Sequence, residues 1–170
     1  MNPRSHRTRI RRIRAVAAAI VALCLSLATT GCASRTFVAS TPAGFVDLGT
    51  KYPEGEYRAT TADGVIIGVR AFDNDPRGPL SFWSRTIERR MREMGGYALI
   101  SRKEVNGRGV LQKGVSFRFG HDEGKEPFIY DLTIFVTSER VYVIEDGGPK
   151  AEVLKQQSEL DAFVARFAAK

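Results

Sequence analysis

Residue types that build reactive or metal centres are scarce in this chain of 170 residues. It contains two cysteines, two histidines and one tryptophan, and only His121 among the cysteines and histidines lies beyond residue 32. Because a zinc site needs three or four ligands, the sequence predicts no metal site and no cofactor in the part that follows. A disulfide is also excluded, since Cys24 lies inside an apolar run and Cys32 lies at its end.

A strong charge of one sign is missing from most of the chain. The formal net charge is +7, but six arginines and no acidic residue stand in the first 14 positions. From Cys32 onward, 20 lysines and arginines face 19 aspartates and glutamates, which leaves +1. Nucleic-acid binding needs a concentrated positive surface, so this near balance predicts no nucleic-acid partner.

The apolar run near the start is too short to cross a bilayer. It covers residues 15–30, whereas a membrane-spanning helix needs about 20 consecutive apolar residues. A cationic segment precedes it, and this order is typical of a secretory signal peptide, here predicted over residues 1–31.

The end of that run, Thr29-Thr30-Gly31-Cys32, resembles the lipobox of bacterial lipoproteins, in which small residues precede a cysteine that is acylated after cleavage. The resemblance implies cleavage between Gly31 and Cys32 and lipid attachment at Cys32, although Thr29 stands where the family usually has leucine. Each buried methylene contributes about 0.8 kcal/mol, so two or three acyl chains would anchor the protein stably. In the same family, aspartate directly after the cysteine marks retention in the inner membrane. Ala33 stands at that position here, so the resemblance implies that the protein is held at the outer membrane and faces the periplasm. The alternative is an ordinary signal-peptidase site followed by a chance cysteine.

The remainder divides into a short polar segment and one domain. Residues 32–44 are rich in small and polar side chains and are predicted to form the lipidated N-terminus and a flexible tether. Residues 45–170 suffice for a single domain with one core.

Alternating apolar residues predict strands over residues 45–48, 56–60, 65–72, 97–105, 110–119, 128–137 and 141–145. Tight links are predicted at Asp63-Gly64, Asn106-Gly107 and Ser138-Glu139. Residues 146–149 are predicted to be a turn. Consecutive hairpins of this kind indicate an antiparallel meander sheet, and hence an α+β fold with helices flanking the sheet.

Two amphipathic helices complete the pattern. Pro79 opens the first, and Ser158 with Asp161 resembles a capping box at the start of the second. The polar side of the first helix carries Arg85, Arg89 and Arg92. These arginines are interpreted either as a docking face for an acidic or phosphate-bearing partner or as a solvated helix face.

This order of elements resembles the PsbP-type, DcrB-like α/β/α sandwich over residues 45–170. The phrases Thr61-Ala62-Asp63-Gly64-Val65 and Val141-Tyr142-Val143-Ile144 add to the resemblance. It implies an accessory or binding protein without catalytic chemistry. The resulting hypothesis is a cell-envelope protein held to the membrane at Cys32 that binds an envelope protein or lipid.

Two other functions stay open. A carrier of a small apolar ligand between sheet and helix would use aromatic residues at strand spacing, here Phe117, Phe119, Phe128, Tyr130 and Phe135. A hydrolase would need a base beside a nucleophile. His121 is predicted to lie in a solvated loop and Ser116 to face outward from a strand, so neither supports catalysis.

Overall fold

The structure is a computed structural model, and it describes residues 35–49, 56–123 and 126–170. The chain divides into residues 1–33 and residues 34–170, and the described residues belong to the second unit. The predicted signal peptide, its cleavage site and Cys32 lie outside the described residues. Within the described ranges, no helix has both the length and the hydropathy needed to cross a bilayer.

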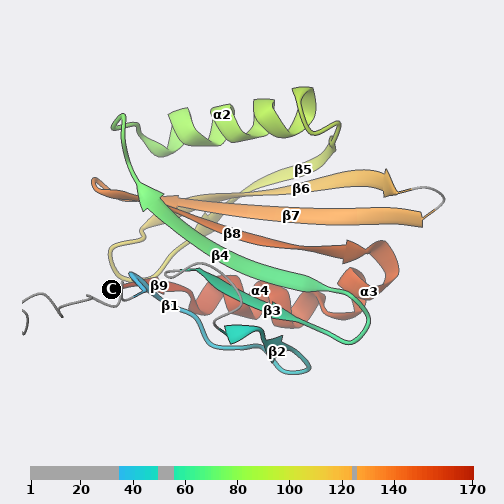
Figure 1. Cartoon of the computed structure of the whole chain (residues 1–170). Coiled ribbons are helices and arrows are strands. Elements are labelled where there is room, and N and C mark those ends of the chain that lie inside the picture. The colour runs from blue at the N-terminus through green and yellow to red at the C-terminus, as the bar shows by residue number, and fades with distance from the viewer. Residues whose placement is uncertain (1–34, 50–55, 124–125) are drawn as a thin grey trace, which may run out of the picture. The chain divides into compact units, whose positions relative to one another are not determined.

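Seven antiparallel strands form one sheet in the order β2-β3-β4-β8-β7-β6-β5 (Figure 1). These strands are β2 (Val46–Asp47), β3 (Tyr57–Thr60), β4 (Ile66–Asp73), β5 (Ala98–Asn106), β6 (Lys113–Glu123), β7 (Glu126–Val136) and β8 (Arg140–Pro149). A separate pair joins the two ends of the domain, β1 (Phe37–Val38) and β9 (Ala168–Ala169).

The last four strands of the sheet form the predicted meander. Neighbours in sequence are neighbours in the sheet from β5 to β8, with Phe117 opposite Leu132 and Ile134 opposite Val143. β4 lies on the other side of β8, and the chain crosses from there to β5 at the far edge. The predicted α+β fold with an antiparallel sheet flanked by helices is confirmed.

Helices cover both faces of the sheet. α2 (Leu80–Glu93) lies on one face, and α3 (Lys150–Lys155) and α4 (Gln157–Arg166) lie on the other (Figure 1). Because side chains alternate along a strand, β7 supplies Leu132 and Ile134 to the core beneath α2, and Ile129 and Phe135 to the core beneath α4. The sheet therefore separates two hydrophobic cores.

The start of α2 is held by one buried amide. The side chain of Asn74 accepts hydrogen bonds from the Gly78 N–H at 2.9 Å and the Trp83 Nε1–H at 2.7 Å. It also donates to the Thr137 carbonyl at 2.9 Å. The loop before Pro79 is thereby tied both to the helix and to the turn between β7 and β8.

The start of α4 differs from the predicted capping box. The helix begins at Gln157, and Gln156 occupies the N-cap position without a side-chain cap. α3 ends at Lys155 and leads almost directly into α4, so Ser158 already lies inside the first turn.

β8 extends further than predicted, because residues 146–149 form its end instead of a turn. Asp146 pairs with Asp131 of β7, and Gly147 pairs with Ile66 of β4. β8 lies between two strands, so ladder hydrogen bonds on both edges outweigh the low strand propensity of glycine.

The packed domain begins before the predicted boundary at residue 45. Phe37 is 1% exposed, and its ring centroid lies 5.6 Å from that of Phe167. β1, which contains Phe37, is held by β9 at the other end of the sequence. The prediction of a flexible tether through residue 44 is therefore corrected. The sequence did not reveal the packing of β1, because its partner β9 is distant in sequence and leaves no local pattern.

Candidate functional site

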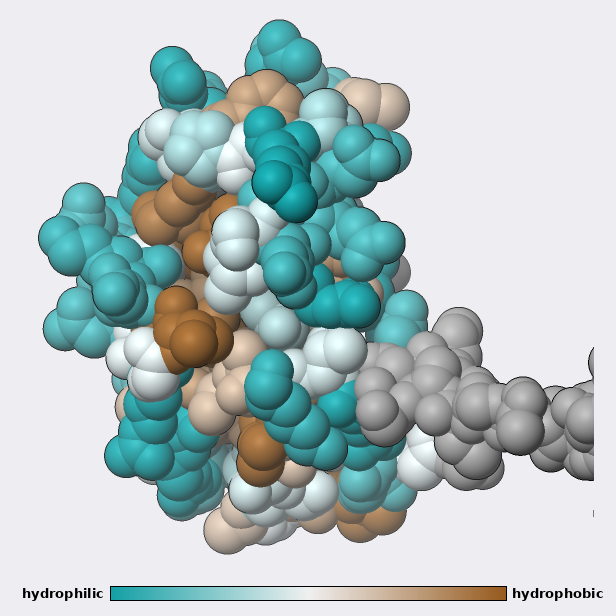
Figure 2. All heavy atoms as spheres, turned by 90° about the vertical axis from the view of Figure 1, so that its left-hand side faces the viewer, coloured by the Kyte–Doolittle hydropathy of each residue, from teal (hydrophilic) through white to brown (hydrophobic). Residues whose placement is uncertain are grey.

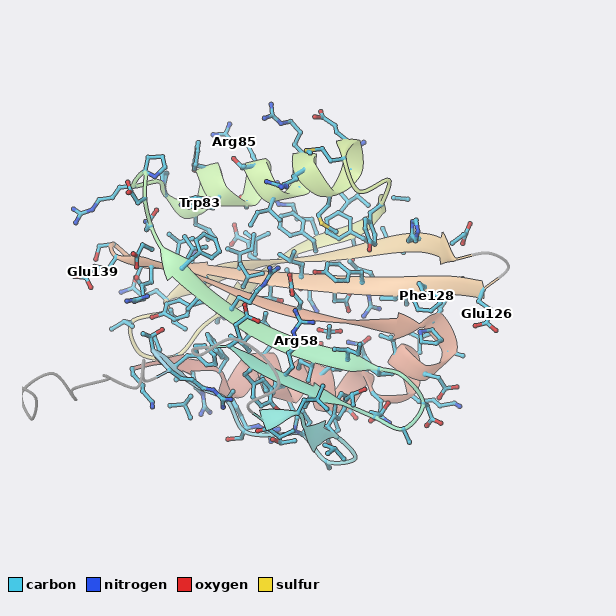
Figure 3. The ribbon with its side chains drawn as sticks, viewed as in Figure 1. Arg58, Trp83, Arg85, Glu126, Phe128 and Glu139 are labelled. Atoms are coloured by element: carbon cyan, nitrogen blue, oxygen red, sulfur yellow. The ribbon has the colours of Figure 1, made fainter. Side chains whose placement is uncertain are left out.

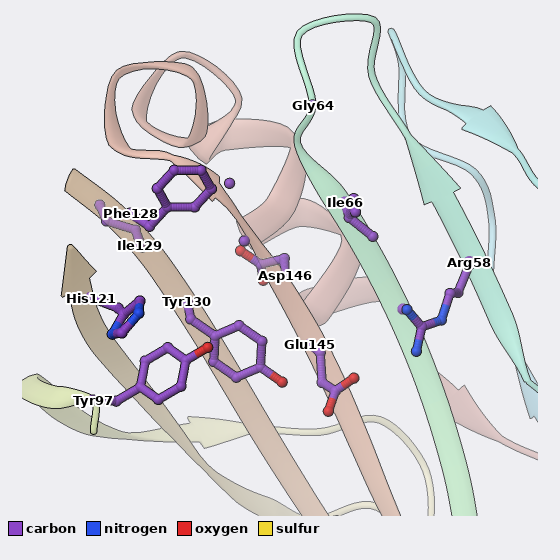
Figure 4. Close-up of a pocket in the computed structure, with 13 residues that line it drawn as sticks. Arg58, Gly64, Ile66, Tyr97, His121, Phe128, Ile129, Tyr130, Glu145 and Asp146 are labelled. Atoms are coloured by element: carbon purple, nitrogen blue, oxygen red, sulfur yellow. The ribbon is translucent and has the colours of Figure 1, made fainter. Parts of the chain in front are cut away.

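An open trough lies on the face of the sheet that also carries α2. Its volume is about 270 Å³, and its floor is the backbone of Gly68 in β4 and Gly147 in β8. Arg58 and Ile66 line one side (Figure 4). The opposite side is lined by the rings of Tyr97, His121, Phe128 and Tyr130. We call this hollow the glycine trough.

The two glycines of the floor are not equivalent. A Cβ at Gly147 would lie 2.9 Å from the carbonyl oxygen of Ile129 and 3.2 Å from the ring of Tyr130. A Cβ at Gly68 would meet Arg58 at 3.5 Å, which is ordinary van der Waals contact. Close packing therefore requires glycine at position 147, whereas a side chain at position 68 would fit and would occupy the trough.

The aromatic side of the trough is contributed by three different strands or their ends. The ring centroid of Tyr97, just before β5, lies 5.0 Å from that of His121 and 5.5 Å from that of Tyr130. His121 belongs to β6, not to the predicted loop, because β6 continues to Glu123. Such rings offer flat apolar area with polar edges to a ligand.

Glu145 places a negative charge on the trough. Its carboxylate forms an ion pair with Arg70, and its side chain is 14% exposed. Burial raises the pKa of Tyr130, and the neighbouring Glu145 carboxylate raises it further. The Tyr130 phenol is therefore neutral at physiological pH and retains its proton for hydrogen bonding.

The lining of the trough combines rings with a few charged groups. Among the described residues that line it there is no serine, threonine, cysteine or lysine, and its titratable side chains are Arg58, Tyr97, His121, Tyr130, Glu145 and Asp146. Across the described ranges, no three histidines, cysteines, aspartates or glutamates cluster closely enough to hold a metal ion. A ligand would be held here by contact with the rings and by hydrogen bonds to Glu145.

The three arginines predicted to form a docking face are exposed on α2, namely Arg85, Arg89 and Arg92. Arg85 points away from the sheet (Figure 3). Arg89 lies 3.8 Å from Glu93, and Arg92 lies 3.8 Å from Glu88, in ion pairs that are weak because both arginines are exposed. The arginines line a shallow groove between α2 and the start of β5, and this groove shares Tyr97 with the glycine trough.

Charged residues also meet beneath α4, where the sequence predicted no site. Arg118 of β6 donates from Nε to Asp131 Oδ1 at 2.8 Å and from its terminal nitrogen to Gln157. Asp146 is 6% exposed, and its Oδ1 has no hydrogen-bond partner in the described part of the chain. Burial, and then the charge of Asp131, raise the pKa of Asp146 well above its ordinary value. We call Arg118, Asp131, Asp146 and Gln157 the polar layer.

The polar layer lines a cavity of about 280 Å³ between the sheet and α4. Ser116 lines the same cavity, so the prediction that it faces outward is corrected. The available signal was the alternation of Ser116 and Arg118 with buried aromatic residues. That alternation is typical of a strand with one solvent-exposed face. The helix that covers this face lies about 40 residues further along the chain, so the local pattern did not reveal it.

The aromatic residues considered for a ligand carrier separate into two groups. Phe117, Phe119 and Phe135 are fully buried at 0% exposure and belong to the two cores. Phe128 and Tyr130 line the glycine trough. These five residues therefore do not enclose a single ligand cavity between sheet and helix.

Comparison with known proteins finds similarity in fold. No family model matches the sequence, and no curated protein matches it. LpqN of Mycobacterium tuberculosis, which is involved in cell envelope biogenesis, matches with a TM-score of 0.63 at 8% identity. The match covers 82% of this chain and 86% of LpqN.

Two further solved structures match less closely in shape. A Bacteroides thetaiotaomicron protein has a TM-score of 0.50 at 17% identity over 81% of this chain, which spans only 47% of that protein's length. The cyanobacterial PsbP protein (CyanoP) of Synechocystis sp. PCC 6803 has a TM-score of 0.49 at 12% identity, covering 84% of this chain and 96% of CyanoP.

Proposed function

We propose that this chain is a lipid-anchored accessory protein of the bacterial cell envelope that acts by binding a partner and not by catalysis. The anchor is Cys32, exposed by cleavage after Gly31, and the membrane is the outer membrane on its periplasmic side. The partner is an envelope protein or lipid. The glycine trough carries the proposal, because an open hollow with an aromatic side and a paired carboxylate is arranged for contact.

Two observations support this function. LpqN, which has a similar fold, is involved in cell envelope biogenesis, and the lipobox resemblance at Cys32 would bring this chain to the cell envelope. The arginines of α2 adjoin the trough at Tyr97. A partner that fills the trough and carries acidic or phosphate groups beside it would engage both surfaces.

Replacing Cys32 with serine is expected to abolish acylation of the protein. The sulfur of the Cys32 thiol forms the thioether to the lipid, and a hydroxyl does not substitute for it in this modification. Labelling of cells with a fatty-acid analogue, followed by isolation of the protein, measures the effect. The variant should lose the label and accumulate as unprocessed precursor.

Cys24→Ser is the matched control, because Cys24 lies within the predicted signal peptide and should be removed with it. Its labelling should equal that of the wild type. Labelling of the Cys32→Ser variant at the wild-type level would contradict the anchor, as would a mature wild-type protein that is found unacylated.

Filling the trough is expected to remove the partner without unfolding the domain. Gly68→Val places a strand-favouring side chain on the floor beside Arg58, whereas Gly68→Ala adds only a Cβ in ordinary contact. Proteins recovered with the tagged, acylated protein from envelope extracts are compared for both variants. The valine variant should lose the partner, and the alanine variant should keep it.

The arginine face is tested in the same extracts. Replacement of Arg85, Arg89 and Arg92 together with glutamine should weaken recovery of the partner at low salt and have less effect at high salt, because exposed charges are screened. Equal recovery by wild type, Gly68→Val and the glutamine variant would contradict binding at both surfaces.

A carrier of a small apolar ligand is the second candidate, favoured by the rings of Phe128 and Tyr130 in the trough. Organic extraction of the purified protein distinguishes the two functions. A stoichiometric small molecule that is present in the wild type and absent from Gly68→Val would favour the carrier.

A further inference from the structure

One end of the domain gathers the first described residues, the last residues and one loop. The Lys170 N–H donates to the Thr36 carbonyl at 2.8 Å, and Val38 pairs with Ala168 across β1 and β9. Arg108, in the loop between β5 and β6, bridges to Ala168. β1, β9 and the C-terminus lie together on the left of Figure 1. We call this end the terminal surface, made up of Arg35, Val38, Arg108, Val110 and Lys170.

The terminal surface is separated from Cys32 by only a short stretch of chain. Phe37 is buried in the core, with its ring against Phe167, so the fold holds the chain from this residue onward. Five residue steps separate Cys32 from Phe37, and at about 3.3–3.6 Å per residue they reach at most about 18 Å. An acylated Cys32 would therefore keep the terminal surface close to the lipid headgroups.

The side chains of this surface match a membrane with anionic headgroups. Val110 is 68% exposed and Val38 is 48% exposed, so both apolar side chains are available for contact with a membrane. Arg108 and Lys170 are exposed, and neither forms an ion pair within the described ranges. Figure 2 views this end, where apolar patches lie among hydrophilic side chains.

Acidic residues do not cancel the positive charge of this end. Arg140 lies 3.3 Å from Asp73 and balances it. Glu139 lines the same hollow as Arg35, Val110 and Lys170. Counting Arg108, four cations (Arg35, Arg108, Arg140 and Lys170) face Asp73, Glu139 and the terminal carboxylate of Lys170, which leaves an excess of one positive charge. Each lysine or arginine near an anionic membrane contributes about 1 kcal/mol of attraction.

We infer that the terminal surface rests against the anionic phospholipid surface that holds Cys32, with Val110 at the boundary between headgroups and acyl chains. Arg108 and Lys170 contact lipid phosphates. This inference rests on the proposed anchor at Cys32. The inference also places the glycine trough away from the membrane. Asp73, at one end of β4, pairs with Arg140 near the terminal surface, whereas Ile66, which lines the trough, lies at the other end of β4.

A nitroxide label at residue 110 tests the orientation. The mature acylated protein has no free thiol beyond Cys32, so Val110→Cys introduces a single labelling site. Ala62→Cys, in the exposed hairpin turn at the other end of β4, is the control. Both are placed in vesicles of phosphatidylethanolamine and phosphatidylglycerol, and the access of oxygen and of a water-soluble nickel complex is measured. The label at 110 should be severalfold less accessible to nickel than the label at 62, and more accessible to oxygen.

Mass spectrometry of the same sample separates the two failures. Equal nickel access at both positions in a protein acylated at Cys32 would overturn the orientation and leave the anchor intact. A protein without acyl chains at Cys32 would overturn both.

A second variant tests the contact with anionic lipid. Arg108→Gln combined with Lys170→Gln should raise the nickel access of the label at 110 in vesicles that contain phosphatidylglycerol. Arg85→Gln combined with Arg89→Gln, on α2, should leave that access unchanged. An equal response to both double replacements would overturn the role of the terminal surface.

Discussion

Replacing Arg118 with methionine is expected to lower the free energy of unfolding by about 3–5 kcal/mol, the loss typical of removing one partner from a buried ion pair. Arg118 is the cation of the polar layer, and its ion pair with Asp131 has side chains 24% and 12% exposed. Without the guanidinium, Asp131 would remain beside Asp146 under α4 with no counter-charge in contact. Urea unfolding at neutral pH measures the change.

Arg85→Met is the matched control, because it removes the same side chain from an exposed helix position. Within the described residues, its guanidinium donates a hydrogen bond to the Ser81 carbonyl of its own helix, at 3.0 Å, and forms no ion pair. The expected change is within about 0.5 kcal/mol. A loss at Arg118 no larger than the loss at Arg85 would contradict the importance of the polar layer for stability.

The same layer makes stability depend on pH. Burial and Asp131 raise the folded-state pKa of Asp146, so above about pH 4 the folded protein retains a proton that the unfolded chain has lost. The contribution of Asp146 to the free energy of unfolding is fully present below that pH and is lost as the pH rises through the folded-state pKa. Asp146→Asn removes the decline, so the variant should gain stability over the wild type as pH increases. Parallel pH profiles for the two proteins would show that the carboxyl is ionised in the fold.

Replacing Phe167 with alanine is expected to lower the free energy of unfolding by about 3–5 kcal/mol, because the cavity left by a buried ring collapses only in part. Phe167 is 2% exposed, and its ring centroid lies 5.6 Å from that of Phe37, 6.1 Å from that of Phe135 and 5.8 Å from that of Tyr142. The replacement would also loosen β1, which reaches the core through Phe37. Thermal and urea unfolding of the purified protein give the magnitude.

Phe82→Ala provides the comparison, since the ring of Phe82 on α2 is 41% exposed and contacts Trp83 from outside the core. Removing a half-exposed ring should reduce stability by about 1 kcal/mol or less. Equal losses at Phe82 and Phe167 would mean that the two ends of the domain do not close on a common core.

Periodic burial explains why most elements could be predicted from sequence. Leu132 and Ile134 alternate with residues of the opposite face, and Leu80, Trp83 and Ile87 repeat at helical spacing, because each element buries a face against one of the cores. Each of these patterns is complete within a few residues. The order of the meander strands and the position of α2 therefore agree with the sequence prediction, whereas β6 begins three residues later than predicted, after a loop in place of the tight link at Asn106-Gly107.

The candidate site was less predictable, because its parts are uninformative when taken alone. Gly147 resembles a turn residue, and its place on the floor appears only when β8 is seen between β4 and β7. Gly68 sits in a strand with no other sign of function. His121 reaches the trough because β6 is longer than its apolar alternation, which ends near Phe119.

Local sequence determined the order of elements, the near-neutral charge beyond Cys32 and the prediction of a lipid at that residue. Tertiary structure alone decided that β1 closes on β9, that Gly68 and Gly147 form one floor, and that Arg118 is covered by α4. The physical reason is distance along the chain. Short-range patterns record which face of an element is buried, whereas contacts between distant segments depend on how the completed sheet and helices pack.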